Sequence, residues 1–433
     1  MDVVEGSSPH ERDPRFDAAF PKVDVDGVTC PNSEQLVEAL MKNGFQRGRI
    51  IAVSLSHLFH DTYQAFLAPL LPLLVGKFGI SLSTAGLLDV VRNLPSLFNP
   101  VLGVAVDRVP VKFFVIITPA VSAILMSFVG LAPSYGIIVL MVFVSGVNSS
   151  LFHVPGPVLV KRLSGGRTGS GMSYYMLGGE LSRTLGPIII TGAISLWTLE
   201  GTWRLFPVGV AASVVLYFVL RDYSAGEGHS TAPTDTRFRE VFRSLLPLFS
   251  FIGGFSVFLL AMKVSVTLYL PAYLVNKGQT LMSASLALSI LQFSGAAGTL
   301  LAGSISDRIG RKATLLISAV ASPSLMWLFI ISGDALAIPI LIAMGFFLFA
   351  PGPVVLALVQ DVSSRAPAFS NGMYMTLNFL IRSLMVFVVG QLIDRIGFDL
   401  TYRMSASWAF ALIPLVLLLP NKVFGKREMG QEE

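Results

Sequence analysis

Residues 303–312, GSISDRIGRK, decide the fold class of this chain. They follow one apolar run, 282–305, and precede another, 313–332. A short loop rich in Lys and Arg between two apolar runs of about 20 residues is typical of a turn between transmembrane helices on the cytoplasmic side of a membrane. The stretch therefore predicts that further apolar runs of similar length surround it.

The first half of the chain contains a counterpart of this stretch. GVAVDR at 103–108 stands 200 residues before its equivalent, and PGPV occurs at both 155–158 and 351–354. SRTL at 182–185 also resembles IRSL at 381–384, at nearly the same offset. These matches indicate two parallel repeats of six helices each, a design that places a substrate site between the repeats near the middle of the bilayer.

The composition agrees with a membrane protein. The chain has 433 residues, of which 53% are hydrophobic and 13% charged, and its mean hydropathy is +0.71. A soluble protein of this length needs a polar shell that this chain lacks, and disordered proteins, coiled coils and disulfide scaffolds have other compositions. The single cysteine, Cys30, excludes an intramolecular disulfide and a cysteine-based zinc site. We therefore expect an all-α polytopic membrane protein with twelve transmembrane helices in two pseudo-symmetric six-helix bundles.

Twelve apolar runs match this expectation, and a polar interruption separates the sixth from the seventh. The predicted parts are a cytoplasmic tail at 1–48 with a possible short amphipathic helix, an N-terminal bundle at 49–220, a cytoplasmic linker at 221–243, a C-terminal bundle at 244–420 and a cytoplasmic tail at 421–433. The runs themselves are 50–75, 83–106, 113–132, 135–160, 169–197, 203–220, 245–275, 282–305, 313–332, 335–359, 369–393 and 404–420.

Lys and Arg gather on one side of these predicted helices. The clusters at 42–49, 161–167 and 308–312 and the linker arginines all fall on that side, and few basic residues fall on the other. The positive-inside rule then places both termini and the linker in the cytoplasm. The first 48 residues lack the apolar segment of a signal peptide, so we expect a multi-pass protein of the cytoplasmic (inner) membrane. Because the net charge of +5 resides in these clusters, we expect the lipid bilayer and no nucleic acid as a partner.

Ionisable residues inside the apolar runs are the candidates for function, because each costs about 2.5–3.5 kcal/mol if it faces lipid at a helix centre. In the first run, His57, His60 and Asp61 have i, i+3 and i+4 spacing and share one helix face. Carboxylates and histidines in such places can bind and release protons, so we predict a proton-coupling site there, with Glu180 as a second carrier. The alternatives are a fixed ion pair of Asp61 with Lys263 and a divalent-metal site at His57, His60 and Asp61.

Charged residues in other runs predict a site for an anionic substrate. Arg382 has no carboxylate within helical reach in its own run, so it needs one from another helix or from the substrate. Arginines and a lysine around one cavity suit a phosphate, phosphonate or carboxylate group. The alternative for the i, i+3 pairs is mutual neutralisation between packed helices. The substrate-binding candidates are Arg92, Arg183, Lys263, Arg382 and Asp89.

At residues 303–312 the chain resembles the major facilitator superfamily, whose loop motif reads glycine, three residues, Asp-Arg, one residue, Gly-Arg-Lys. The first-half copy departs from that motif at 109–111 and retains Lys112. Within the superfamily the chain is similar to the fosmidomycin-resistance-type efflux transporters from about residue 50 to 420. The signs of this similarity are SHLFHD at 56–61, Phe152-His153 followed by Pro155, SGGR at 164–167, Gly178-Gly179 leading to Gly186-Pro187, and Lys263. The resemblance implies a transporter that works by alternating access, and the Gly-Pro element resembles an antiporter motif.

The two loops and one histidine are the gating candidates. Acidic and basic groups at helix ends can hold the two bundles together through charge pairs and helix dipoles, and the alternative is that they enforce topology and tight turns. His153, beside the Pro155-Gly-Pro157 element, is either part of a gate or a packed histidine. The gating candidates are Gly103, Asp107, Arg108, Lys112, Gly303, Asp307, Arg308, Gly310, Arg311, Lys312 and His153.

These observations favour a monomeric secondary transporter that exports a small anionic or amphipathic compound in exchange for protons, with no cofactor other than the coupling ion. Proton-coupled import of a small organic anion is the first alternative, and export of a divalent metal through the histidines of the first run is the second. A non-transporting membrane sensor is the alternative from another class. An enzyme is not expected, because no nucleotide loop, hydrolase motif or nucleophile–base set is present in the sequence.

Overall fold

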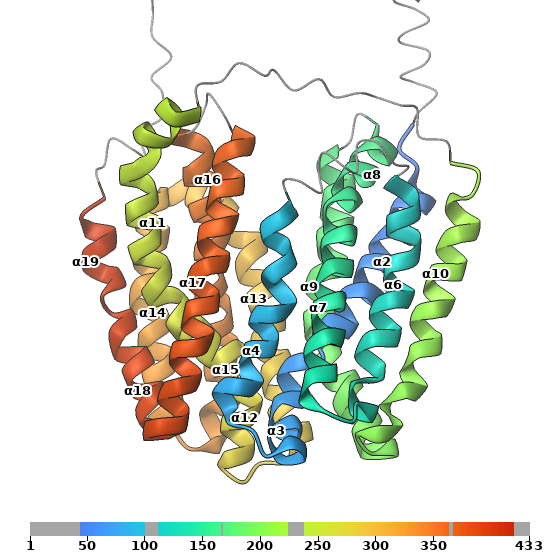
Figure 1. The fold of residues 1–433 in the computed structure, drawn as a ribbon. Helices are drawn as coiled ribbons and strands as arrows, with labels where there is room; N and C mark the ends of the chain where they lie inside the picture. The colour runs from blue at the N-terminus through green and yellow to red at the C-terminus, as the bar shows by residue number, and fades with distance from the viewer. Residues whose placement is uncertain (1–43, 100–110, 166–167, 224–237, 363–366, 420–433) are drawn as a thin grey trace, which may run out of the picture. The chain divides into compact units, whose positions relative to one another are not determined.

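A computed structural model describes residues 44–99, 111–165, 168–223, 238–362 and 367–419. These residues are helical almost throughout and include no strand. The residues from Phe45 onward form one compact unit (Figure 1). The predicted amphipathic helix and the gating candidates Gly103, Asp107 and Arg108 lie outside the described residues.

The first half of the unit runs from α2 to α10. Its helices are α2 (Arg47–Gln64), α3 (Leu67–Phe78), α4 (Leu82–Asn93), η1 (Leu94–Phe98), α6 (Val111–Ser127), η2 (Val129–Leu131), α7 (Tyr135–His153), α8 (Pro155–Ser164), α9 (Thr168–Trp197), η3 (Glu200–Leu205) and α10 (Phe206–Leu220).

The second half runs from α11 to α19. Its helices are α11 (Phe238–Thr267), α12 (Leu270–Asn276), α13 (Leu281–Ile309), α14 (Arg311–Ile331), α15 (Asp334–Phe349), α16 (Pro351–Val362), α17 (Pro367–Ile396), α18 (Phe398–Ala409) and α19 (Leu412–Leu417).

Nine helical segments of the described chain are long and apolar enough to cross a membrane. The predicted spans outside these nine are α2–α3, α4 and α9, and these helices carry the charged residues Asp61, Asp89, Arg92, Glu180 and Arg183. The chain thus has the twelve-helix architecture that its apolar runs predict.

The two halves break their helices at equivalent places. α7 gives way to α8 at Pro155, and α15 gives way to α16 at Pro351, because proline lacks the N–H that a helix interior needs and its ring clashes with the preceding turn. Similar short breaks separate α2 from α3 and α11 from α12. The repeat that the sequence indicates is therefore visible in the backbone.

The helices run between two ends of the unit (Figure 1). We call the end that holds α8, α16 and the Ile309–Arg311 turn the basic end, because Lys161, Arg308 and Lys312 lie there. The opposite end, which holds α3, α12, the start of α4 and the last turn of α17, is the far end.

The packing joins the halves at several pairs of helices. α4 contacts α17, α9 contacts α13 and α3 contacts α12, in each case one helix from each half. One buried cluster contains residues from both halves, among them Leu70, Leu88, Val264, Tyr269 and Val389. Many large apolar side chains are exposed on the outside of the helices, as expected for a surface that faces lipid.

Candidate functional site

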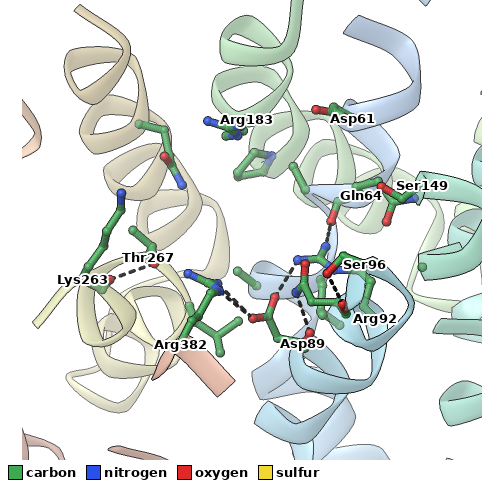
Figure 2. Close-up of a pocket in the computed structure, with 18 of the residues that line it drawn as sticks. Asp61, Gln64, Asp89, Arg92, Ser96, Ser149, Arg183, Lys263, Thr267 and Arg382 are labelled. Atoms are coloured by element: carbon green, nitrogen blue, oxygen red, sulfur yellow. Dashed lines mark hydrogen bonds and ion pairs between the residues drawn. The ribbon is translucent and has the colours of Figure 1, made fainter. Parts of the chain in front are cut away.

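A cavity of about 450 Å³ lies between the two halves. Its walls come from α2, α3, α4, η1, α7 and α9 of the first half and from α11, α13, α15 and α17 of the second. Figure 2 shows how the charged side chains of both halves surround the same space. The charged residues in the lining are Asp61, Asp89, Arg92, Arg183, Lys263 and Arg382.

Three histidines surround Asp61 on α2. Its carboxylate lies 3.2 Å from Nε2 of His57 and 3.1 Å from Nε2 of His153, which is on α7. Nε2 of His60 is 3.9 Å away. His57, His60 and Asp61 are buried, whereas the His153 side chain is 38% exposed. Asp61 and His153 also line the cavity, so the cluster borders it directly.

A hydrogen bond determines the protonation of His57. Its Nδ1 lies 2.8 Å from the backbone carbonyl oxygen of Tyr175, which can accept but not donate, so Nδ1 carries a proton. In the neutral ring, Nε2 then carries a lone pair and no proton. It makes no aligned hydrogen bond, although Oδ2 of Asp61 is 3.2 Å away. A lone pair and a carboxylate repel each other at this distance, so the pair is favourable only when it holds one further proton.

His60 lies beside a buried serine. Oγ of Ser122 accepts hydrogen bonds from Gln64 and Asn148, and it lies 3.1 Å from Nδ1 of His60. The backbone of Thr118 is a further hydrogen-bond partner of the ring. Nε2 of His60 makes no hydrogen bond to a described residue and stands 3.9 Å from Asp61.

Asp89 on α4 forms an ion-pair triad with two arginines. Its Oδ1 lies 2.6 Å from Nη2 of Arg92, at the i, i+3 spacing that the sequence predicts. Its Oδ2 accepts from Nη2 of Arg382 at 2.9 Å and from Nε at 3.2 Å. Arg92 also donates to the backbone carbonyl of Gln64. The anion that Arg382 requires is therefore a carboxylate on the other half of the unit.

The second predicted i, i+3 pair is also present. Nη1 of Arg183 lies 2.9 Å from Oε1 of Glu180, and both residues are on α9. Glu180 is buried and does not line the cavity, whereas the Arg183 side chain is 45% exposed and does. Arg183 therefore borders the cavity, and its partner Glu180 lies outside the cavity lining.

Among the basic side chains that line the cavity, Lys263 on α11 has no carboxylate of the described residues as an ion-pair partner. Its Nζ stands 3.9 Å from the centre of the Phe349 ring, within reach of a cation–π interaction. No carboxylate of the described residues lies within ion-pair distance of it, and the alternative pair with Asp61 is not formed. Arg183, Arg382 and Glu180 are near enough to interact with it electrostatically. Two cations and one carboxylate therefore surround Lys263.

The loop candidates of the basic end have structural partners. Oδ1 of Asp307 lies 2.7 Å from Nη1 of Arg311, and Gly310 between them has a φ of 93°, which glycine adopts without strain. Nζ of Lys312 donates to the carbonyls of Leu417 and Leu419, which end the last helix of its half. Lys112 does the same for Arg221 and Tyr223 in the first half. Gly303 and Arg308 lie in the last turns of α13, next to this turn.

A divalent metal would find ligands in a different set from the predicted one. One ligand atom each from His57, Asp61 and His153 lie within 4.8 Å of one another. His60 is not part of that group, because its Nε2 is farther from the carboxylate. His153, considered from the sequence as a gating residue, therefore belongs to the Asp61 cluster.

Sequence reasoning missed several polar partners in this site. Gln64, Ser122 and Asn148 form a buried hydrogen-bonded network around His60, and Ser145 joins it through Gln64. The available signal was their position, because each is a polar residue inside an apolar run. Uncharged polar side chains cost less inside a membrane than Asp or Arg, so their presence in an apolar run is a weaker indication of a site.

The cavity between two repeats of transmembrane helices defines a membrane transporter. The sequence model of the Major Facilitator Superfamily matches residues 53–388, and the chain belongs to this family of transporters. Its members are secondary transporters and not enzymes.

Relatives of known sequence and structure agree with this assignment. The chain is 26% identical over 391 residues to the fosmidomycin resistance protein of Escherichia coli, covering 86% of this chain and 93% of that protein. It is 24% identical over 386 residues to the uncharacterized MFS-type transporter YfnC of Bacillus subtilis, covering 86% and 92%. The crystal structure of a D-xylose–proton symporter has the same fold, with a TM-score of 0.68 at 17% identity over 87% of this chain and 98% of that one.

Proposed function

We propose that this protein exports a small organic anion from the cytoplasm in exchange for protons. Lys263, Arg183 and the Asp89–Arg382 pair form the anion site, and Asp61 with His57 is the proton carrier. The observation that carries the proposal is the position of both groups on the wall of one cavity between the two halves.

The charge of the cavity supports an anionic cargo. Four cationic side chains and two carboxylates line it, and the carboxylates are already paired. A carboxylate, phosphonate or sulfonate group next to Lys263 would compensate the remaining positive charge, with Arg183 as a second donor. Leu67, Leu268 and Phe349 add apolar surface, so the cargo can also carry a small apolar body. A divalent metal as cargo is disfavoured, because the same cations would repel it.

Proton coupling is supported by the His57–Asp61 contact. The Nδ1 proton of His57 is donated to the backbone carbonyl of Tyr175. The 3.2 Å contact between Nε2 and the Asp61 carboxylate is therefore favourable only when the pair holds one more proton. Removal of that proton makes the contact repulsive, so the local structure depends on whether the proton is bound. Glu180 is the less favoured carrier, since it pairs with Arg183 and does not line the cavity.

Export is favoured over import by one relative. The Escherichia coli relative is described as a resistance protein, and removal of a compound from the cell is a direct route to resistance. Proton-coupled import of an organic anion uses the same site and is the remaining candidate. The two differ in which direction a pH gradient drives the anion.

Reconstituted protein in liposomes tests the proposal. A panel of anions (acetate, benzoate, methylphosphonate, methanesulfonate and fosmidomycin) is screened by thermal shift, and stabilising compounds are tested for counterflow and for movement after a pH jump. We expect accumulation of the anion in the compartment from which protons leave. Asp61→Asn should abolish this gradient-driven movement while counterflow continues. Accumulation in the opposite compartment would establish symport, and full gradient-driven activity of the variant would refute the role of Asp61.

A further inference from the structure

The far end of the unit contains a contact between the two halves that the cavity does not use. Asp394 lies in the last turn of α17, and its two carboxylate oxygens face the start of α4. Oδ1 accepts a hydrogen bond from the backbone N–H of Leu82 at 3.0 Å, and Oδ2 accepts one from Ser83 at 2.9 Å. A side chain of one half therefore caps a helix of the other.

This cap stabilises the N-terminal end of α4. The first N–H groups of a helix have no partner within the helix, and the N-terminal end carries a partial positive charge. Ser81 satisfies the N–H of Thr84 from within the first half, and Asp394 satisfies two more from the second half. A negative carboxylate is the most favourable acceptor at this place.

Two further contacts surround the cap. Nε2 of Gln391, one turn before Asp394, donates to Oγ of Ser83 at 3.0 Å. The hydroxyl of Tyr269, at the break between α11 and α12, donates to the carbonyl of Val386 on α17 at 2.9 Å and lies directly against Gly86 of α4. A Cβ on Gly86 would come within 2.1 Å of the Tyr269 hydroxyl oxygen, so only glycine permits this approach.

We propose that Asp394 is a latch that keeps the far end closed by holding α17 against the start of α4. The contact of Tyr269 with Gly86 packs the same two halves together beside this latch. For the cavity to open toward the far end, α4 must separate from α17, and the two N–H groups of α4 must lose the carboxylate. The latch concerns the conformational cycle alone, so it does not depend on the identity of the cargo or of the coupling ion.

Two substitutions act on the latch in opposite physical ways. Asp394→Asn removes the charge and one acceptor, and its amide group faces a backbone N–H with another N–H donor. Gly86→Ala keeps Asp394 and forces a methyl group against Tyr269. Both should favour molecules that are open at the far end. The Gly86→Ala/Tyr269→Phe double variant removes the hydroxyl that meets the methyl group and should return part of the way to wild type.

The matched control is Asp399→Asn. Asp399 is also a carboxylate at the far end, and its Oδ1 lies 3.4 Å from Nζ of Lys277, but both residues belong to the second half. Loss of this pair breaks no contact between the halves, so the control should behave as wild type.

Pulsed electron–electron resonance between spin labels measures the opening. Gly136 at the start of α7 and Gly333 before α15 lie at the far end of different halves. Among the described residues, no heavy atom comes closer than 4.0 Å to a Cβ added at either position. Gly136→Cys and Gly333→Cys are made in a Cys30→Ser background, which leaves no other cysteine in the sequence.

We expect the ratio of long to short distances to rise about five- to tenfold in Asp394→Asn, the effect of losing a helix cap of ordinary strength. Gly86→Ala should shift the distribution in the same direction, and it tests the latch even if Asp394→Asn fails to fold. A wild-type distribution in a folded Asp394→Asn sample, or an equal shift in Asp399→Asn, would overturn the proposal.

Discussion

Asp61 and Asp89 are buried carboxylates on the same cavity, but their partners differ in kind. Histidines surround Asp61, and all of them belong to the first half. Two arginines hold Asp89, one from each half. A histidine can lose its charge at ordinary pH, whereas an arginine cannot. On the proposed function, the first site changes its charge during a transport cycle, whereas the second has a fixed charge that joins the halves.

On the proposed function, each carboxylate has a separate role. Protonation at Asp61 would alter a contact within one half, and the interface between the halves would stay intact. The Asp89–Arg382 ion pair crosses that interface next to the cavity, so an anion bound near Arg382 can compete with Asp89 for it. We therefore expect substitutions at the two carboxylates to affect different properties.

The largest effect on stability is expected for Asp89→Asn. The substitution leaves Arg92 and Arg382 without their carboxylate, and breaking a buried ion pair typically costs about 3–5 kcal/mol. Asp61→Asn should cost less, because its histidine partners can become neutral. Thermal unfolding of the purified variants in one detergent measures both. Equal unfolding temperatures for Asp89→Asn and Asp61→Asn would contradict the expected difference between the two carboxylates.

A smaller effect on binding is expected for Lys263→Met. The variant keeps a long apolar side chain against Phe349 and loses the charge, so the affinity for the stabilising anion should fall about 10- to 100-fold, the equivalent of one charge-assisted hydrogen bond. Titration of the purified protein with that anion, followed by intrinsic fluorescence, gives the affinity.

Lys277→Met is the matched control for this prediction. Lys277 lies at the far end beside Asp399, away from the lining of the cavity. Its substitution should leave the affinity unchanged. If both variants lost affinity to the same degree, a general effect of net charge would explain the result better than the proposed site.

The sequence predicts most of the fold because its signals are local and repeated. Apolar runs of membrane-spanning length, the basic loop at 303–312 and the two copies of PGPV are each readable without knowledge of the packing. The breaks at Pro155 and Pro351 follow directly from the chemistry of proline. Ion pairs at i, i+3 spacing were predictable for the same reason, since a helix fixes the distance between such residues.

Contacts between distant helices were not predictable in this way. The sequence shows that Arg382 needs an anion, but not that Asp89 supplies it from another half. His153 is 92 residues from Asp61, and no periodicity connects the two. Asp394 reads as a charge near the end of an apolar run, and its role at the start of α4 depends on how α17 packs.

The most direct test of the central claim is to count protons at the moment of anion binding. Purified protein in weakly buffered detergent is mixed with the stabilising anion of highest affinity, and a pH-sensitive dye such as pyranine reports the protons released. The account predicts release of about one proton per wild-type molecule when the anion binds, and loss of that release in an Asp61→Asn variant that still binds the anion. Release of the same size from Asp61→Asn, or no release from wild type at saturating anion, would contradict it.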